Sequence, residues 1–450
     1  MPTSVARFAL DTESRDMPFS ARHAAARLLL DTLGVLCAAT PMRAGCIARS
    51  TALALYGSAD QSAVARIPFD GRRASVAGAA WAAASATDNL DAHDGYNPTK
   101  GHIGVAVVPA LLAMAQTEAR PLSGADALAA LIVGYEVAGR AGVALDSTVS
   151  DYHTSGAWNA LGVAALAARL KQQSEAALRE ALGIAEFHGP RSQMMREIDN
   201  PSMLHDGSGQ GALIGLSAYV MAENGFLGAP AITVEADDVQ SIWADLGDVW
   251  QVERQYIKPY PICRWAHAAL DGLAALVREH GLSVDDIARV RVETFHEAAQ
   301  LFAGMPETTS EAQYSLRFAL ATLVVHGEIG PAQIDGAALS DSRVAALLAR
   351  IDVAEHARFS TRFPADRMAC VSVETQAGAH LNSGDLHARG GPEGPLSENE
   401  VSEKFHRFAA PVLGASRAEA IERATLALTD DDSTFDGLLD LVLAPIGEPQ

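Results

Sequence analysis

The stretch ASVAGAAWAAASAT, residues 74–87, consists almost entirely of alanine, glycine and serine. Alanine is the strongest helix former, and a helix with so little side-chain volume gains stability only by packing closely against other helices. The pattern therefore predicts a buried helix in the core of a helical domain.

The segments around this helix continue the same pattern. Apolar residues recur at helical spacing before it and after it, which predicts further helices over residues 19–40, 103–116, 122–144, 154–170, 174–187 and 211–224. Pro109 lies inside one of these segments, where we expect a kink. The first half of the chain is thus predicted to be all-helical.

The pattern changes near residue 255, where two prolines follow within a few residues. Apolar and polar residues alternate as in strands over 287–295 and 368–375, and 379–386 is a hairpin partner for the second strand. Helices are predicted before the first strand at 266–280, between the strands at 314–325 and 340–351, and from 398, after the capping residue Ser397.

A chain of 450 residues is too long for one core, which favours two domains. We predict a mainly α fold, in which a large all-helical domain spans residues 1–258 and is completed by 400–450. A smaller α+β domain spans 259–399.

The net charge of −21 argues against nucleic acid or an anionic membrane as partner. It also means that an anionic substrate needs a local basic pocket. Acidic residues at 11, 13 and 16 do not resemble a secretory signal, and the four cysteines form no CxxC pair, so we expect a cytoplasmic protein with reduced thiols. No uncharged stretch is both long and apolar enough to predict a membrane span.

Several common catalytic motifs do not occur: HExxH, GxSxG and the Walker A pattern. Gly207, Gly209 and Gly211 have GxGxG spacing, but no predicted strand precedes them, so close helix packing is the better interpretation than a dinucleotide site. The sequence thus gives no indication of a metal or an organic cofactor.

The first candidate site is a polar segment between two apolar helices. It contains Asp88, Asp91, His93, Asp94, Lys100 and His102. A solvated loop with capping acids is the simpler interpretation. However, His102 stands at the start of a buried helix, where backbone N–H groups attract carboxylates and a histidine can exchange a proton.

Two further clusters carry candidate residues. Tyr152 and His153 precede a helix start, where an ordinary cap is the alternative. Lys258, Arg264 and His267 lie at the predicted domain junction, where a Lys and an Arg can bind a carboxylate, or else form an inter-domain salt bridge. Arg191 is a weaker candidate for anion binding.

Taken together, these motifs resemble the MmgE/PrpD superfamily over nearly the whole chain. The resemblance rests on their order: Gly101-His102-Ile103-Gly104, Gly134-Tyr135-Glu136-Val137, Tyr152-His153, Lys258-Pro259-Tyr260-Pro261 with His267, Tyr314-Ser315 with Phe318-Ala319, and Pro395-Leu396-Ser397 before Lys404-Phe405. It implies a homodimer without metal or cofactor. By similarity to the decarboxylase of the family, Asp91, His102, His153 and Lys258 fall on active-site positions.

The chain also departs from that decarboxylase, which has a threonine at the position of Gly95 and a second histidine at that of Cys263. A further active-site lysine of the decarboxylase falls in 202–205, where this chain has none. These departures weigh against decarboxylation of cis-aconitate and leave dehydratase and epimerase chemistry open.

The sequence therefore predicts a lyase, of dehydratase type, that acts next to a carboxylate of a small di- or tricarboxylic acid. Lys258, with Arg264, would hold a substrate carboxylate; His102 and His153 would be base and acid; Asp91 would orient a histidine. Lys100, Tyr152, Arg191 and His267 would line the substrate site. An epimerase of a dicarboxylate such as iminodisuccinate and a non-catalytic polycarboxylate-binding homologue are the alternatives.

Overall fold

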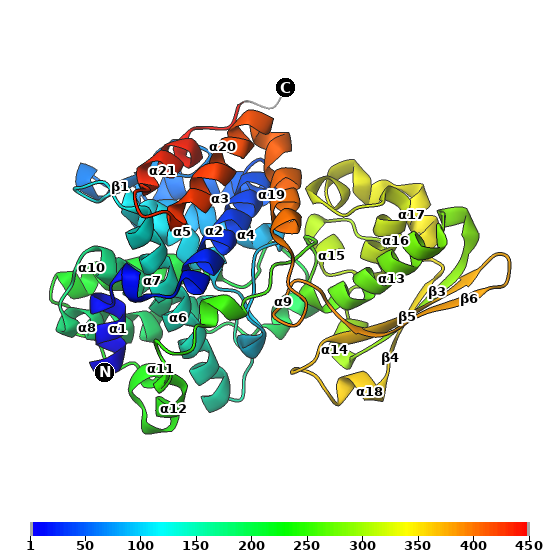
Figure 1. Ribbon diagram of the computed structural model, residues 1–450, viewed down its shortest axis with the longest axis horizontal. Coiled ribbons are helices and arrows are strands. Elements are labelled where there is room, and N and C mark those ends of the chain that lie inside the picture. Colours follow the sequence, from blue (N-terminus) through cyan, green and yellow to red (C-terminus); the bar gives the residue numbers. More distant parts are fainter. Residues whose placement is uncertain (1–2, 448–450) are drawn as a thin grey trace. The chain divides into compact units, whose positions relative to one another are not determined.

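A computed structural model describes residues 3–447 and divides the chain into two compact units. The helical unit comprises Met1–Met194, His205–Ile257 and Ser397–Gln450, and the mixed unit comprises Met195–Leu204 and Lys258–Leu396. The short segment Met195–Leu204, which the sequence predicts within the helical domain, thus belongs to the mixed unit. Each unit is clear in Figure 1, the first almost entirely helical and the second with the one larger sheet.

The prediction of a large helical domain is confirmed. Its principal helices are α1 (Thr3–Asp11), α2 (Phe19–Ala39), α3 (Arg43–Leu55), α4 (Val76–Leu90), α5 (Gly104–Ala115), α6 (Gly124–Thr148), α7 (Gly156–Leu170), α8 (Glu175–His188), α10 (Ser208–Glu223), α19 (Glu398–Leu413), α20 (Ala415–Leu426) and α21 (Phe435–Leu443). Two short helices, α11 (Ile232–Glu235) and α12 (Gln240–Trp243), and a small ribbon of β1 (Val64–Arg66) and β2 (Arg73–Ser75) complete it.

The small-residue helix α4 lies among α2, α3, α5 and α10, as its composition predicted. Its N-cap is Ser75, whose side chain accepts a hydrogen bond from the N–H of Gly78. At the crossing with α10 a Cβ atom on Gly209 would lie 2.1 Å from the Oγ of Ser85. The glycine-rich start of α10 therefore serves close helix packing, as expected.

The C-terminal helices pack within the same unit as the N-terminal ones. In Figure 1 the orange and red helices α19 and α20 lie beside the blue helix α2, and both contact it. The Nζ of Lys404 on α19 donates to the buried carboxylate of Asp31 on α2. The same ammonium donates to the carbonyl of Ala92 over 2.7 Å. Helix α19 thus contacts, through Lys404, the segment that follows α4.

Helix α6 is the one described helix that is long and apolar enough to cross a membrane by length and composition alone. A second such span arises only if the sharply bent pair α2 and α3 is counted as one. Of the most apolar window of α6, 94% is buried inside the structure, which is the condition of a core helix.

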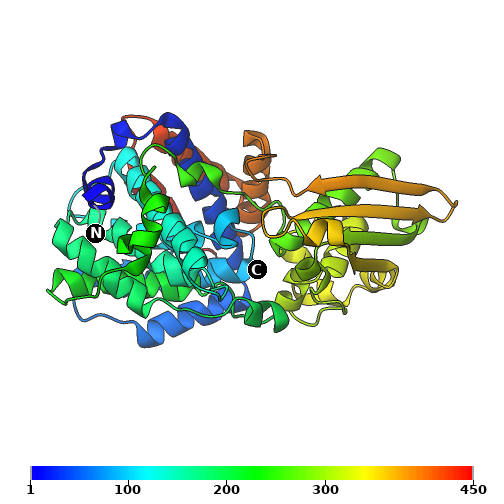
Figure 2. The same cartoon turned by 90° about the horizontal axis from the view of Figure 1, so that it is seen from below.

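The mixed unit contains a four-stranded sheet in the order β4-β3-β5-β6. Its strands are β3 (Ile287–Thr294), β4 (Ile351–Glu355), β5 (Met368–Thr375) and β6 (His380–His387), and its helices are α9 (Met195–Asp199), α13 (His267–His280), α14 (His296–Ala299), α15 (Thr309–Gln313), α16 (Leu316–His326), α17 (Ser342–Leu348) and α18 (Ala357–Ser360). Strands β5 and β6 form the predicted antiparallel hairpin, the pair of long orange arrows in Figure 2.

One predicted element of this unit is wrong in part. The helix expected over 340–351 ends at Leu348, and Ile351 instead begins β4, which pairs in parallel with β3. A five-residue edge strand has too few residues for its alternation to stand out after a helical segment. Valines 290, 292, 371 and 373 are buried in the sheet, and α13 packs on β5 and β6.

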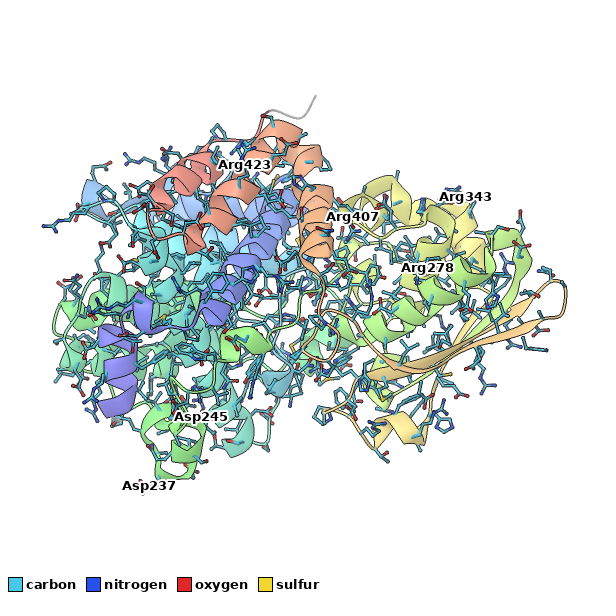
Figure 3. All side chains as sticks on the ribbon, in the orientation of Figure 1. Asp237, Asp245, Arg278, Arg343, Arg407 and Arg423 are labelled. Atoms are coloured by element: carbon cyan, nitrogen blue, oxygen red, sulfur yellow. The ribbon has the colours of Figure 1, made fainter. Side chains whose placement is uncertain are left out.

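The charged side chains that Figure 3 labels, Asp237, Asp245, Arg278, Arg343, Arg407 and Arg423, are all exposed on their units. Charged side chains that are buried are therefore informative. In the helical unit several of them gather around the segment between α4 and α5.

Candidate active site

The segment that joins α4 to α5 is polar yet buried. Asp91, His93, Asp94 and His102 are each at most 6% exposed. Asp91 ends α4 in the left-handed region with φ of 52°, and Lys100 adopts φ of 53°. Non-glycine residues in this conformation cost energy and concentrate at functional sites. The simpler interpretation of this segment as a solvated loop is wrong.

Asp94 anchors the segment to three helices. Its carboxylate accepts hydrogen bonds from the N–H of Gly104 (3.2 Å) and the hydroxyl of Tyr135 (3.1 Å), and a longer one from Thr32 (3.4 Å). Burial raises the pKa of this carboxyl to about 6, although the nearby His93 opposes the shift. The backbone carbonyl of Asp94 contacts two histidines.

His93 and His102 meet at that carbonyl. The Nδ1 of His102 lies 2.6 Å from the carbonyl oxygen of Asp94, and the Nδ1 of His93 lies 3.3 Å from it. Because a carbonyl only accepts, both rings carry their proton on Nδ1, which leaves the lone pair of each neutral ring on Nε2. The rings are 4.5 Å apart and nearly perpendicular.

Each Nε2 faces a carboxylate. That of His102 lies 3.7 Å from Oδ2 of Asp206, which immediately precedes α10, and that of His93 lies 3.6 Å from Oδ1 of Asp88 on α4. Burial, reinforced by the negative charge of Asp88, raises the pKa of Asp206 to about 7. Two imidazole–carboxylate pairs thus stand side by side, with the His93 ring fully buried and the His102 ring slightly exposed.

The start of α7 fixes His102 and Asp206 together. The Oγ of Ser155 accepts from the N–H of His102 (2.9 Å) and donates to Oδ1 of Asp206. The N–H of Ser155 also donates to Oδ1 (3.2 Å), and the side chain of Asn159 donates to the carbonyl of His102 (3.0 Å). The backbone and the ring of His102 are therefore both held.

Tyr256 fills the space that a side chain at position 95 would need. Gly95 and Tyr256 exchange two backbone hydrogen bonds of 2.9 and 2.8 Å, and a Cβ on Gly95 would lie 2.3 Å from the tyrosine hydroxyl. The ring centroid of Tyr256 is 6.1 Å from that of His102. The departure from threonine at this position is thus accommodated by an aromatic wall beside His102.

The other predicted residues of the helical unit lie in a neighbouring layer. His153 lines a cavity of about 10 Å³ with Thr99, Gly142, Leu145, Asp146, Asp151 and Trp158. The hydroxyl of Tyr152 donates to the carbonyl of Lys100, whose Nζ lies 2.7 Å from the carboxylate of Asp146. Arg191 is exposed. The structure therefore pairs His102 with His93 by ring contact, and places His153 at this small cavity.

The third cluster belongs to the mixed unit. Lys258 is 1% exposed there. The guanidinium of Arg264 donates to the carbonyls of Arg389 (2.6 Å) and Ala388 (3.2 Å), and Nε2 of His267 lies 2.8 Å from the carbonyl of Ile262. These bonds hold Arg264 and His267 within the unit, and their part in substrate binding stays a prediction. Convergence of Lys258 with the two histidines stays a prediction.

Sequence reasoning missed two residues of the site, Asp206 and Tyr256, and gave no role to a third, His93. His93 was part of the recognised polar segment, but nothing distinguished it from its neighbours. Asp206 and Tyr256 lie more than 100 residues from His102, and no spacing connects them to it. Within the helical unit the imidazoles lie among Asp88, Asp91, Asp94 and Asp206, and the predicted basic pocket, which depends on Lys258, stays a prediction.

This arrangement is suited to moving protons. Among residues 3–447 no group of three or more His, Cys, Asp or Glu side chains is placed to hold a metal ion. A neutral imidazole with a fixed tautomer and a carboxyl with a pKa near neutrality are a general base and a proton reservoir. Proton transfer is therefore a reaction that these side chains can perform.

Comparison with known proteins assigns the chain to a family. Residues 3–245 match the MmgE/PrpD N-terminal domain, and residues 260–430 match the MmgE/PrpD C-terminal domain. The chain is 25% identical over 379 residues to the cis-aconitate decarboxylase of Homo sapiens, covering 78% of this chain and 76% of that one. It is 23% identical over 370 residues to a cis-aconitate decarboxylase-like protein of Aspergillus oryzae, covering 73% and 74%. The chain belongs to the MmgE/PrpD family, whose members are largely enzymes, dehydratases and decarboxylases, that act on small carboxylic acids.

Proposed function

We propose that this protein is a cofactor-independent lyase of dehydratase type, acting on the carbon next to a carboxylate of a small di- or tricarboxylic acid. The observation that carries the proposal is the ring of His102. Its Nδ1 is fixed on the carbonyl of Asp94, and Nε2 is the basic atom of the neutral ring. It is the more exposed of the two paired imidazoles, and so the one that a substrate can reach.

In the proposed reaction Nε2 of His102 removes the proton from the α-carbon, and negative charge develops on the adjacent carboxylate. The family resemblance places Lys258 and His153 at active-site positions, and we assign Lys258 to binding a substrate carboxylate and His153 to acid catalysis. Asp91 would contribute to the charge around the imidazoles. Loss of the hydroxyl group as water then completes the elimination.

An epimerase of a dicarboxylate such as iminodisuccinate is the second candidate, because the same base can return a proton to the same carbon. A non-catalytic polycarboxylate-binding protein is the third. The space at Gly95 that Tyr256 fills supports a substrate other than that of the cis-aconitate decarboxylases. By family resemblance we further propose a homodimer, which light scattering of the purified chain would test. The acidic N-terminal residues and the absence of CxxC pairs support a cytoplasmic location.

A panel of di- and tricarboxylates followed by NMR in D₂O separates the candidates. A lyase forms an alkene; an epimerase incorporates deuterium at the α-carbon without an alkene; a binding protein is stabilised against heat without turnover.

His102→Ala should lower kcat by ~10²–10⁴-fold with the fold intact, the usual contribution of one acid–base group. The matched control is His188→Ala, which removes an exposed histidine of the same unit. Turnover of His102→Ala close to that of the control would remove His102 from the mechanism.

A further inference from the structure

The helical unit exposes a group of large apolar side chains beside α8. The stretch FLGAPAI, residues 226–232, contains no charged and no hydrogen-bonding side chain. Together with its neighbours it forms what we call the apolar strip, whose members are between 48% and 78% exposed: Phe187, Val220, Phe226, Leu227 and Ile232. Soluble proteins rarely leave a contiguous apolar surface of this kind in water unless it binds something.

Backbone hydrogen bonds fix residues 226–232 on α8. The N–H of Gly228 donates to the carboxylate of Glu180 over 2.5 Å, and the N–H of Ile232 donates to the carboxylate of Glu186 over 2.7 Å. A Cβ atom on Gly183 would lie 1.7 Å from a backbone carbonyl of the stretch, which therefore lies directly on the helix. Since Glu180 and Glu186 are about 9 Å apart along α8, the stretch is held at both ends.

The remaining members of the strip adjoin this stretch. Phe187 directly follows Glu186 at the end of α8. Val220 lies near the end of α10, where the N–H of Phe226 donates to the carbonyl of Met221 over 3.0 Å. Helices α8 and α10 contact one another and lie side by side in Figure 1. The five side chains thus belong to one region of the surface, with a backbone that is already fixed.

The size of the strip matches one half of a dimer interface. With side-chain areas of ~150–200 Å², the exposed fractions of its five members amount to ~500 Å² of apolar surface. A stable interface buries ~800 Å² on each partner, and ~65% of it is apolar in homodimers, which is again ~500 Å². The strip is therefore large enough to be the apolar centre of such an interface.

The distribution of charge favours a second copy as the occupant. The chain has a net charge of −21, so two copies repel one another except where uncharged faces meet. The strip carries no charge, and the neighbouring Arg179 is paired with Glu235 of the same chain, over 2.9 Å. The negative net charge also disfavours an anionic membrane as the occupant.

We propose that the apolar strip is the face through which two copies of this chain associate about a two-fold axis. In such an interface the same patch of each copy meets the other, so every member of the strip is buried twice. The inference rests on the homodimer proposed above, to which it assigns a face, and it does not depend on the reaction.

The experiment compares Leu227→Asp with a matched control, Leu55→Asp, in the full chain. Leu55 lies at the end of α3, outside the strip, and is 70% exposed, against 77% for Leu227. Sedimentation over a range of protein concentrations gives the mass and the dissociation constant. We expect wild type and Leu55→Asp to have twice the chain mass of 47.2 kDa. Leu227→Asp should raise the dissociation constant at least ~10²-fold, because a carboxylate would lose its water in both copies.

Phe187→Asp keeps the proposal testable if Leu227→Asp does not fold. It changes the strip from α8, and its control is Phe19→Asp, which changes another exposed phenylalanine of the helical unit. We expect Phe187→Asp to dissociate and Phe19→Asp to remain a dimer. Folded Leu227→Asp and Phe187→Asp that both stay dimers as tightly as their controls would overturn the assignment of the face, and the homodimer would stand.

A wild type that sediments as a single chain would overturn both the face and the homodimer. Binding of that single chain to phosphatidylcholine vesicles, lost in Leu227→Asp, would then assign the strip to a lipid surface. None of these measurements needs a substrate. The proposed reaction can therefore fail, with no carboxylic acid converted, while the dimer face stands.

Discussion

The buried ion pair of Lys404 and Asp31 offers a direct test of how the C-terminal helices support the site. The side chains are 3% and 0% exposed, and the ammonium also donates to the carbonyl of Ala92. Lys404→Met removes the cation and, with it, the bonds to Asp31 and to the carbonyl of Ala92. It leaves the carboxylate of Asp31 buried without its principal partner.

Removal of one member of a buried pair costs about 3–5 kcal/mol, because the remaining charge keeps its desolvation penalty. Lys171 provides the matched control: its Nζ also binds one carboxylate, Glu118 at 2.8 Å, and one carbonyl, Thr117 at 2.8 Å. These side chains are 23% and 19% exposed, so Lys171→Met should cost no more than about 1 kcal/mol. The difference between the two substitutions measures burial.

Urea unfolding followed by tryptophan fluorescence is the assay, because Trp81, Trp158, Trp243 and Trp250 lie in the helical unit and only Trp265 lies in the other. Asp31→Leu with Lys404→Met removes both charges and should recover most of the loss. Equal costs for Lys404→Met and Lys171→Met, or no recovery in the double variant, would refute the reasoning. Lys404→Met should also lower turnover, because Ala92 lies next to Asp91 and His93.

Two further predictions concern the helical unit. Burial raises the pKa of Asp94 to about 6 and those of Asp206 and Glu136 to about 7, so the folded unit binds protons that the unfolded chain releases. The free energy of unfolding should therefore fall as the pH rises from about 5 to about 8. Urea midpoints that rise over this range would contradict the prediction. Gly209→Ala should lower the free energy of unfolding by about 1–3 kcal/mol, because the new Cβ would lie 2.1 Å from Oγ of Ser85. Adding Ser85→Ala to the same chain should restore stability. Thermal unfolding of the single and the double variant measures this, and equal stability of the two would count against close packing.

The fold could be predicted to a large extent because its strongest signals are local. The alanine run of α4, the helical spacing of α2 and the alternation of β5 and β6 each lie within one element, and each element formed where it was expected. The strand β4 was missed because its five residues carry too little periodicity. Its pairing with β3 supplies what its own sequence does not specify.

The site was predicted only in part. His102 was found because it stands at a helix start after a glycine, a local signal, and Asp91 was found with it. Asp206 and Tyr256 reach His102 from more than 100 residues away, on the segments before α10 and after α12. Such contacts arise when helices pack, and residue spacing along the chain contains no record of them.

By itself the sequence determined that this protein has a helical core of small residues, a smaller α+β part and a polar segment with a candidate catalytic histidine, because periodicity and composition act within single elements. The tertiary structure alone decided which groups face that histidine. A carboxyl becomes a proton partner through its distance, burial and charged neighbours, and these quantities exist only once the chain has folded.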